Sequence, residues 1–254
     1  MSSEDIVTAA VLVIGDEILS GRTKDRNSGT IASHLTDIGI RLREVRVVAD
    51  VEAEIVAALN SLRARYTYVF TTGGIGPTHD DITADAVATA FGVSIGVSPD
   101  AEAILKSYYV GRGLELTDAR RRMARIPAGA SLIDNRISGA PGFMLGNVIV
   151  MAGIPDIMAV MLEAVTPTLA TGARMLTATL TVNRPESEIA ATLEAHQRRY
   201  LDVAMGCYPF LCDGRPASEL VLRSTSAERL NDAIATLRTA LDLPVQPPSP
   251  PRQI

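Results

Sequence analysis

Residues 9–165 alternate short apolar runs with segments in which apolar side chains recur at helical spacing. Ala9–Gly15 is continuously apolar and of strand length, which is typical of a strand buried on both faces. Further runs of strand length follow at Val45–Ala49, Tyr68–Thr72 and Val148–Ala152. Strands that alternate with helices build a parallel sheet with helices on both of its faces. The pattern therefore predicts an α/β fold with a doubly wound, mostly parallel sheet.

Boundary residues locate the helices between these strands. Gly92 ends one helix, Pro155 begins another, and Asp50 is predicted to cap the helix after the second strand. The inward faces of the helices are formed by apolar residues three or four apart, namely Ile31, Leu35, Ile38, Ile55, Leu59, Leu62, Val87, Ala90, Met158, Leu162 and Val165. Gly129–Val150 is broken by glycine, proline and asparagine, which predicts a hairpin there.

A second, smaller unit follows along the chain. Residues 174–243 show the order strand, helix, strand, strand, helix, which predicts a small α+β domain. Threonine, proline and glycine cluster at 166–173, so we expect one domain over residues 1–172 and another over residues 173–243. Residues 244–254 are rich in proline, which predicts an extended tail.

Composition argues against several classes of function. The formal net charge of −5 disfavours an extended nucleic-acid surface, because such a surface needs a basic face. The first residues lack the pattern of a secretory signal, and no apolar run approaches the ~18 residues that span a bilayer. Cys207 and Cys212 are too few for a disulfide scaffold, which favours reduced thiols. We therefore expect a cytoplasmic protein that binds neither nucleic acid nor a membrane.

The segment Thr71–Thr83, TTGGIGPTHDDIT, is the least random part of the chain. It follows a predicted strand and precedes a helix, at the edge where open α/β sheets bind ligands. Glycines let a backbone approach a ligand closely, and free amides and threonine hydroxyls bond anionic oxygens. The predicted ligand-binding residues here are Thr72, Gly73, Gly74, Gly76, Pro77, Thr78 and Thr83. The alternative is a turn without a ligand, because any tight strand-to-helix connection can use glycine.

Two acids lie near the end of this segment. Asp80 and Asp81 would repel an anion unless a cation lay between them, and hard carboxylate oxygens suit Mg²⁺ or Mn²⁺. The alternative is that one of them caps the helix that begins near Thr83. A cap needs only one acid, so we expect at least one of the two to face the ligand.

A second polar cluster follows the first strand. It contains Gly15, Asp16 and Glu17 and, further on, Asn27. The ends of neighbouring strands in such a sheet lie side by side, so this cluster is expected to line one cleft with the Thr71–Thr83 loop. Asp16 and Glu17 are then candidate metal ligands or bases, and solvated loop acids are the alternative.

Three motifs together resemble a known family. GDEILSG at 15–21, TTGGIGPTHDDIT at 71–83 and NRISGAPGF at 135–143 are similar to the N-terminal domain of competence/damage-inducible protein A (CinA). That domain belongs to the molybdopterin-binding superfamily, which includes MogA and MoaB. The likeness covers nearly all of residues 7–165, and residues 182–222 resemble the small domain that follows in CinA and in relatives of FAD synthase. One departure is Ala152, which stands where the family has proline.

The resemblance implies a nucleotide or pterin ligand, such as molybdopterin, on the glycine-rich loop. It also implies that Asp81 is essential and that Asp50, at the end of the second strand, is a second catalytic acid. Pro141 and Gly142 of the third motif are further implied ligand-binding residues.

The leading functional hypothesis is a divalent-metal-dependent hydrolase that cleaves the pyrophosphate of a dinucleotide-like compound such as ADP-ribose or FAD. In this hypothesis Asp80, Asp81 and either Asp16 or Glu17 hold the cation, Mg²⁺ or a similar ion. One alternative is a molybdenum-cofactor enzyme that binds molybdopterin and transfers an adenylyl group to it. Another is a non-catalytic binding module. We expect a homo-oligomer, either a dimer or a trimer.

Two further groups of residues have simpler interpretations. His34 and His196 fall in helical patterns and are expected to be partly exposed. The basic run formed by Arg120, Arg121, Arg122 and Arg125 is interpreted as a solvated or ion-paired surface. The alternative for this run is that it supplies positive charge to a second phosphate of the ligand.

Overall fold

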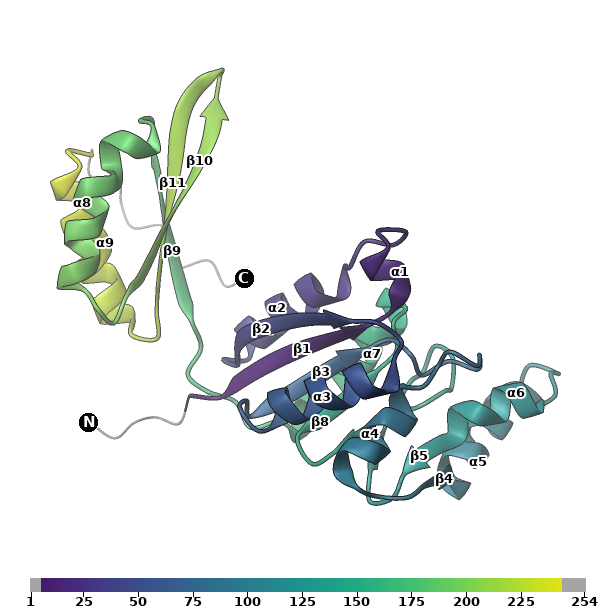
Figure 1. Ribbon diagram of the computed structural model, residues 1–254. Helices are drawn as coiled ribbons and strands as arrows, with labels where there is room; N and C mark the ends of the chain where they lie inside the picture. Colours follow the sequence, from purple (N-terminus) through teal and green to yellow (C-terminus); the bar gives the residue numbers. More distant parts are fainter. Residues whose placement is uncertain (1–5, 244–254) are drawn as a thin grey trace. The chain divides into compact units, whose positions relative to one another are not determined.

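The structure is a computed structural model that describes residues 6–243. It divides the chain into two compact units, residues 1–172 and 173–254. The stretch 244–254, predicted as a proline-rich tail, lies outside the described residues. The first unit is a mixed sheet with helices on both faces, and the second is a smaller sheet with two helices (Figure 1).

The sheet of the first unit contains β1 Thr8–Ile14, β2 Arg41–Val48, β3 Tyr68–Thr72, β6 Ser131–Ile133, β7 Gly142–Leu145 and β8 Val148–Met151. The strand order is β2-β1-β3-β8-β7-β6. β2, β1, β3 and β8 pair in parallel, whereas β7 pairs antiparallel with both β8 and β6. The predicted mostly parallel sheet, with a hairpin inside Gly129–Val150, is confirmed.

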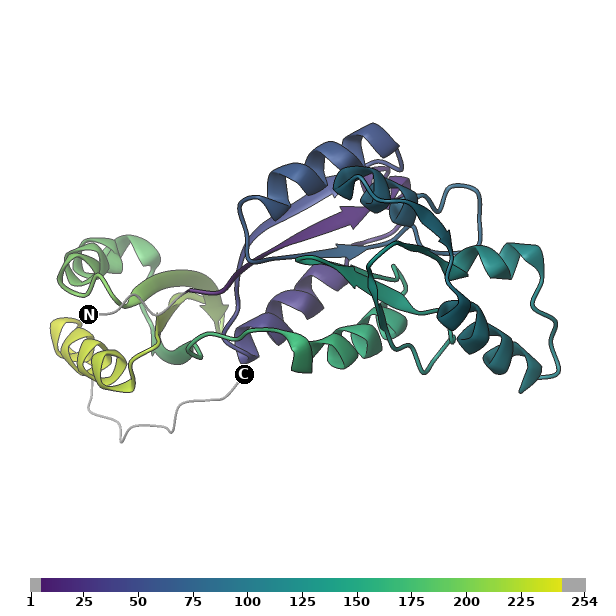
Figure 2. The ribbon, with the colours of Figure 1, turned by 90° about the horizontal axis from the view of Figure 1, so that it is seen from below.

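The helices of the first unit are α1 Asp16–Leu19, α2 Asn27–Asp37, α3 Glu52–Arg63, α4 Thr83–Phe91, α5 Pro99–Val110, α6 Asp118–Arg121 and α7 Pro155–Val165, with 3-10 turns η1 Arg122–Ala124 and η2 Thr166–Thr168. α3 and α4 cover one face of the sheet and α2 and α7 the other (Figure 2). β1 serves both cores because alternate side chains point to opposite faces: Leu12 and Ile14 pack on the side of α3, and Val11 and Val13 on the side of α2. Among the helices of residues 6–243, none has the length and apolar character needed to cross a bilayer.

Two local features differ from the sequence-based expectation. β2 begins at Arg41 rather than at Val45, since its pairing with β1 starts where Thr8 faces Arg41. β2 lies at the sheet edge and is only half-buried, so its first half carries polar side chains that hide the strand signal. The sequence also does not predict the antiparallel ribbon of β4 Ile95–Val97 with β5 Arg125–Pro127. Strands of three residues are too short to show a periodicity.

The second unit contains β9 Leu176–Val182, α8 Glu186–Arg199, β10 Ala204–Cys212, β11 Arg215–Ser224 and α9 Ala227–Ala240. Its three strands are antiparallel in the order β10-β11-β9, and α8 and α9 cover one face of this sheet (Figure 1). The predicted order of elements is confirmed. His196 is only 7% exposed, and its Nε2 lies 2.9 Å from the carbonyl oxygen of Ala233, so the expectation of a partly exposed histidine is wrong. His196 lies on the face of α8 that packs against α9, so the second helix buries a side chain that α8 alone would expose.

Candidate functional site

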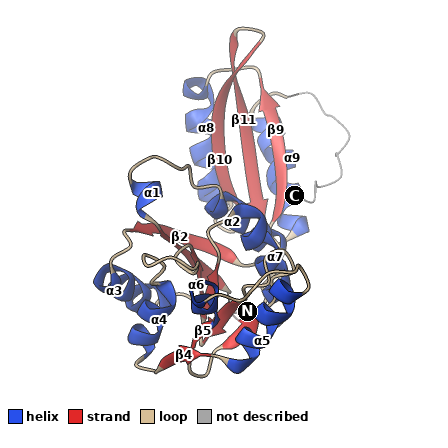
Figure 3. Cartoon of the chain, turned by 90° about the vertical axis from the view of Figure 1, so that its right-hand side faces the viewer, coloured by secondary structure: helices blue, strands red, loops and turns tan. Residues whose placement is uncertain are grey.

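The two polar segments singled out in the sequence follow neighbouring strands. β1 ends at Ile14 and β3 at Thr72, and these parallel strands pair with Val13 opposite Thr72. Gly15 and Gly73 therefore leave the sheet side by side at its carboxyl edge. Figure 3 shows this side of the unit and labels α1. Asp16 and Glu17 form the first turn of this helix.

The glycine-rich loop is anchored to the end of β1 and to the start of α4. Gly73 has a φ of 102°, and a Cβ at this position would overlap the carbonyl oxygen of Ile14. The Thr83 hydroxyl donates to the Gly73 carbonyl (3.0 Å), and the Thr83 amide donates to the Gly74 carbonyl (3.0 Å). Thr83 is fully buried, so its hydroxyl fixes the shape of the loop, and its role in ligand binding stays a prediction.

Asp81 closes a turn inside this loop. Its Oδ2 accepts the backbone N–H of Thr78 (2.8 Å) and the Thr78 hydroxyl (2.5 Å), while Oδ1 has no hydrogen bond within residues 6–243. No side chain caps α4, so the alternative that Asp80 or Asp81 serves as a helix cap is wrong. The pKa of exposed Asp80 lies below its usual value, chiefly because the same Thr78 hydroxyl approaches it.

Asp50 lies among other acids. Its Oδ2 accepts the backbone N–H of Asp16 (2.9 Å), and α3 begins without a side-chain cap, so the predicted capping role of Asp50 is wrong. Partial burial raises the pKa of Asp50 above its usual value, against the hydrogen bond that lowers it. The negative charges of Asp16, Glu17 and Asp80 raise this pKa further. The charges acting on Asp50 thus come from the segments that follow both β1 and β3, which brings the two polar clusters together.

The expected metal ligands Asp16, Glu17, Asp80 and Asp81 do not form a ready-made cage. Within the described part of the chain, no three or more His, Cys, Asp or Glu side chains are grouped so as to hold an ion. The donor chemistry nevertheless fits Mg²⁺, which is commonly held by one or two carboxylates together with substrate phosphates and waters. Asp16, Glu17 and Asp80 repel the charge of Asp50, and a cation bound among these carboxylates would reduce that repulsion. These residues therefore fit a cation that arrives with a phosphate ligand better than a permanent metal centre.

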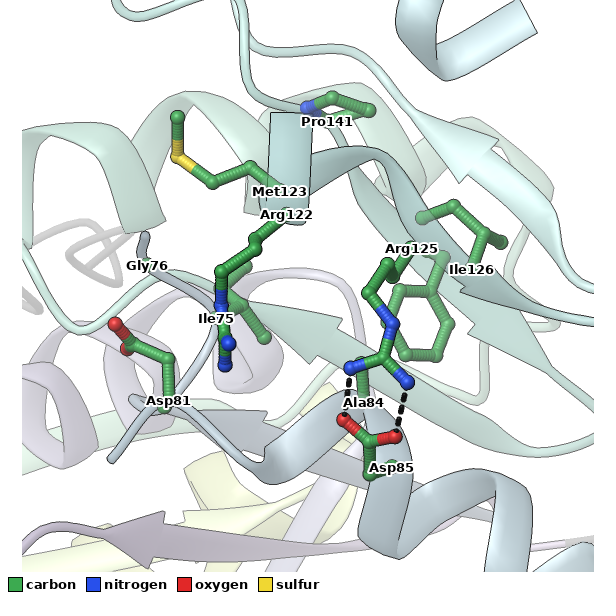
Figure 4. A pocket seen from close by; sticks show the side chains of 12 residues that line it. Ile75, Gly76, Asp81, Ala84, Asp85, Arg122, Met123, Arg125, Ile126 and Pro141 are labelled. Atoms are coloured by element: carbon green, nitrogen blue, oxygen red, sulfur yellow. Dashed lines mark hydrogen bonds and ion pairs between the residues drawn. The ribbon is translucent and has the colours of Figure 1, made fainter. Parts of the chain in front are cut away.

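A pocket opens between the glycine-rich loop and the segment after α6 (Figure 4). Gly74, Gly76 and Asp81 line it from the loop, and Arg122 and Arg125 line it from the opposite wall. Its enclosed volume is about 20 Å³, which holds about one water molecule. A larger ligand would therefore bind at the open mouth of the pocket, along the loop.

The other predicted ligand-binding residues have different surroundings. Pro141 lines the same pocket, whereas Gly142 is buried in β7, where a Cβ would lie 2.5 Å from the carbonyl oxygen of Val150. Gly142 is thus required for strand packing. Asn27 is buried at the start of α2; its amide donates to the carbonyl of Gly153 (2.7 Å), and its Oδ1 has no partner among residues 6–243. Pro77 and Thr78 are exposed on the loop, and Gly15 and Thr72 are buried at the strand ends.

An ion pair between Asp85 and Arg125 is the part of the pocket that the sequence does not predict. Two guanidinium nitrogens of Arg125 donate to the two carboxylate oxygens of Asp85 (2.8 and 2.6 Å). The partners are 40 positions apart, and only the β4–β5 ribbon brings Arg125 back to α4. The basic run at 120–125 is the one local signal that pointed to this wall.

Comparison with known proteins places both units. Residues 10–171 match the family described as probable molybdopterin binding domain, and residues 174–246 match the FAD synthase middle domain. A CinA-like protein of Desulfosudis oleivorans is 41% identical over 192 residues, which cover 71% of this chain and 46% of that protein. A CinA-like protein of Geobacter metallireducens is 36% identical over 248 residues, covering 91% of this chain and 59% of that protein. The chain thus spans about half the length of these curated relatives.

One solved structure is similar at the level of both sequence and fold. The crystal structure of the protein CinA with unknown function from Thermoplasma acidophilum is 34% identical to this chain, with a TM-score of 0.59. The match covers 63% of this chain and 96% of that structure. The matched part of this chain is therefore about as long as the first unit.

Replacing Gly73 tests the anchoring of the loop. Gly73→Ala is expected to lower the free energy of unfolding by roughly 3 kcal/mol. The cost of placing alanine at a positive φ adds to the cost of its overlap with the Ile14 carbonyl. Gly92→Ala is the matched control: its φ is 66°, but a Cβ there meets nothing within 4 Å, so only a conformational cost of about 1 kcal/mol remains. Urea unfolding measures both variants, and equal losses would contradict the proposed anchoring.

The acidic cluster predicts how stability depends on pH. Because folding raises the pKa of Asp50, the folded protein still holds this proton at pH values where the unfolded chain has lost it. The wild type therefore loses stability as pH rises between the usual and the raised pKa. Asp50→Asn keeps an oxygen for the Asp16 amide but has no proton to lose, so its melting temperature relative to wild type should increase as pH rises from about 4 to about 7.

The control for this measurement is Asp100→Asn, which changes an exposed acid in the first turn of α5. Its melting temperature relative to wild type should not show the same trend. An offset between Asp50→Asn and wild type that is constant with pH would contradict the repulsive cluster.

Proposed function

This chain belongs to the family described as probable molybdopterin binding domain, and from that premise we propose that it is a divalent-metal-dependent pyrophosphatase acting on a dinucleotide-like compound such as ADP-ribose or FAD. The α/β fold and the resemblance to CinA-like proteins, both predicted from the sequence, are confirmed by the matches. The chain spans only part of those relatives, and the proposal rests on the site itself.

One observation carries the proposal: a loop suited to phosphate lies beside an excess of negative charge. Asp16, Glu17 and Asp80 all act electrostatically on Asp50, at the edge where the glycine-rich loop leaves the sheet. A loop that bound an anion alone would be weakened by these carboxylates. A loop that binds a phosphate together with a hard cation is strengthened by them.

The groups of the chain would divide the reaction among them. Backbone amides of the loop at Gly74 and Gly76 would donate to pyrophosphate oxygens. Asp50 and Asp16, with Asp80, would hold the cation. A cation bound there would neutralise charge on the phosphates and would lower the pKa of a water molecule. Hydrolysis adds water across the P–O–P bond and releases AMP together with a second phosphomonoester.

Asp81 is the candidate for positioning the attacking water. Its Oδ2 is fixed by two hydrogen bonds from Thr78, so the carboxylate has one orientation, and its Oδ1 is available to accept a proton or a hydrogen bond. A general base needs this combination of fixed geometry and a free acceptor.

The description of the matched family, probable molybdopterin binding domain, favours one alternative, a protein that binds molybdopterin. In this alternative the protein would also transfer an adenylyl group to it. Molybdopterin carries a phosphate, so the same loop amides would serve it, and the two functions differ in the second reactant. A non-catalytic module would bind either compound without forming product. The expected dimer or trimer stays a prediction.

Asp81→Asn separates catalysis from structure. The substitution keeps the size of the side chain and an oxygen for the two Thr78 bonds but removes the negative charge. Purified protein with Mg²⁺ is incubated with ADP-ribose, FAD or molybdopterin, and AMP release is followed. We expect the wild type to release AMP from ADP-ribose or FAD, and Asp81→Asn to be at least about 100-fold slower with a melting temperature close to that of the wild type.

Asp100→Asn is the matched control and should keep wild-type turnover, because this acid lies outside the pocket. Wild-type turnover by Asp81→Asn would remove Asp81 from the mechanism. A wild-type protein that releases no AMP but binds molybdopterin tightly would move the function to the molybdenum-cofactor alternative.

A further inference from the structure

Arg122 is the unpaired cation of the pocket wall. Its guanidinium points toward the loop that carries Gly76 and Asp81 (Figure 4). Within residues 6–243, the Arg122 side chain forms no hydrogen bond or ion pair. The other arginines of the run are engaged: Arg125 binds Asp85, Arg121 binds Glu102 (2.6 Å), and Arg120 donates to the Glu115 carbonyl.

The backbone beneath Arg122 is fixed although its side chain is free. Ala124, two positions on, is fully buried, and its carbonyl accepts the amide of Ser98 (2.8 Å). The next strand, β5, then pairs with β4. The guanidinium is thus presented to the pocket by an ordered main chain, which reduces the entropy lost when a ligand binds.

The charge of Arg122 is not a general excess of positive charge on the protein. The chain carries a formal net charge of −5, and the loop across the pocket from Arg122 contributes Gly74, Gly76 and the acid Asp81. Glycine-rich loops of this kind favour an anion through their backbone amides. Arg122 and the glycine positions of the loop are thus the two parts of the pocket lining that would favour an anion, with Asp81 beside them. The enclosed volume of about 20 Å³ is too small for a phosphoryl group, so the anion would lie at the mouth, within reach of the exposed Arg122 side chain.

We infer that Arg122 binds the second phosphoryl group of a pyrophosphate-linked ligand, while the loop amides bind the first. A guanidinium donates two parallel N–H bonds to phosphate oxygens and cannot lose its proton, which suits this role. A monophosphate would occupy the loop and leave Arg122 unused. Arg122 would thus be the residue that distinguishes a diphosphate-linked ligand from a monophosphate. This inference rests on the proposed function.

The test measures binding without turnover. The methylene-bridged analogue of ADP-ribose, which cannot be cleaved between its phosphorus atoms, and AMP are each titrated with Mg²⁺ by calorimetry into wild type, Arg122→Gln and Arg121→Gln. We expect Arg122→Gln to bind the analogue about 10- to 100-fold more weakly and to bind AMP as the wild type does. Arg121→Gln, a neighbouring arginine on the same short segment, should bind both ligands as the wild type does.

Other results would overturn the inference. Unchanged affinity of Arg122→Gln for the analogue would remove Arg122 from the site, and an equal loss for AMP would assign it to the first phosphate. A wild type that binds the analogue no more tightly than AMP would also contradict it. Failure of this inference is distinguishable from failure of the proposed function. The proposed function fails if the wild type never releases AMP from ADP-ribose or FAD. If Arg122→Gln still binds the analogue more weakly than the wild type in that case, the binding site is supported without the catalysis.

Discussion

The contact between Gly73 and the end of β1 is the constraint on which the rest of the site depends. β1 is buried on both faces, so the core holds it in place. The loop that leaves β3 packs against the Ile14 carbonyl at the end of β1 and is held in place by this contact. The buried Thr83 hydroxyl then ties the loop to the first turn of α4. Asp81 and the amides before it are therefore held by the core of the first unit, and not by the loop alone.

The glycine-rich loop has acidic side chains on one side and basic side chains on another. Acids from the segments after β1 and β3 act on Asp50, whereas Arg122 and Arg125 line the pocket beside Gly74 and Gly76. An acidic protein can thus bind an anion in two ways, with a cation recruited by carboxylates and with a guanidinium placed directly. A pyrophosphate offers oxygens to both, because its two phosphorus atoms are joined by one bridging oxygen.

Local patterns in the sequence were sufficient for some of this structure. The continuous apolar run of β1 indicates a buried strand, and the glycines after β3 indicate a tight turn. Both signals lie within a few consecutive residues, so the sheet and the loop could be predicted. The pairing of Asp85 with Arg125 could not, since it depends on a three-residue ribbon between distant segments. Asp50 shows the same limit: its position before a helix predicts a cap, but its carboxylate instead accepts the amide of Asp16, at the start of the short helix that follows β1.

We propose that a pyrophosphate and a divalent cation bind together at this loop. The most direct test titrates Mn²⁺ into the protein with and without the methylene-bridged analogue of ADP-ribose and follows bound Mn²⁺ by electron paramagnetic resonance. The account predicts weak binding of Mn²⁺ alone, because residues 6–243 contain no group of three or more ligating side chains, and much tighter binding with the analogue present. Tight binding of Mn²⁺ to the protein alone, or binding that the analogue does not change, would contradict it.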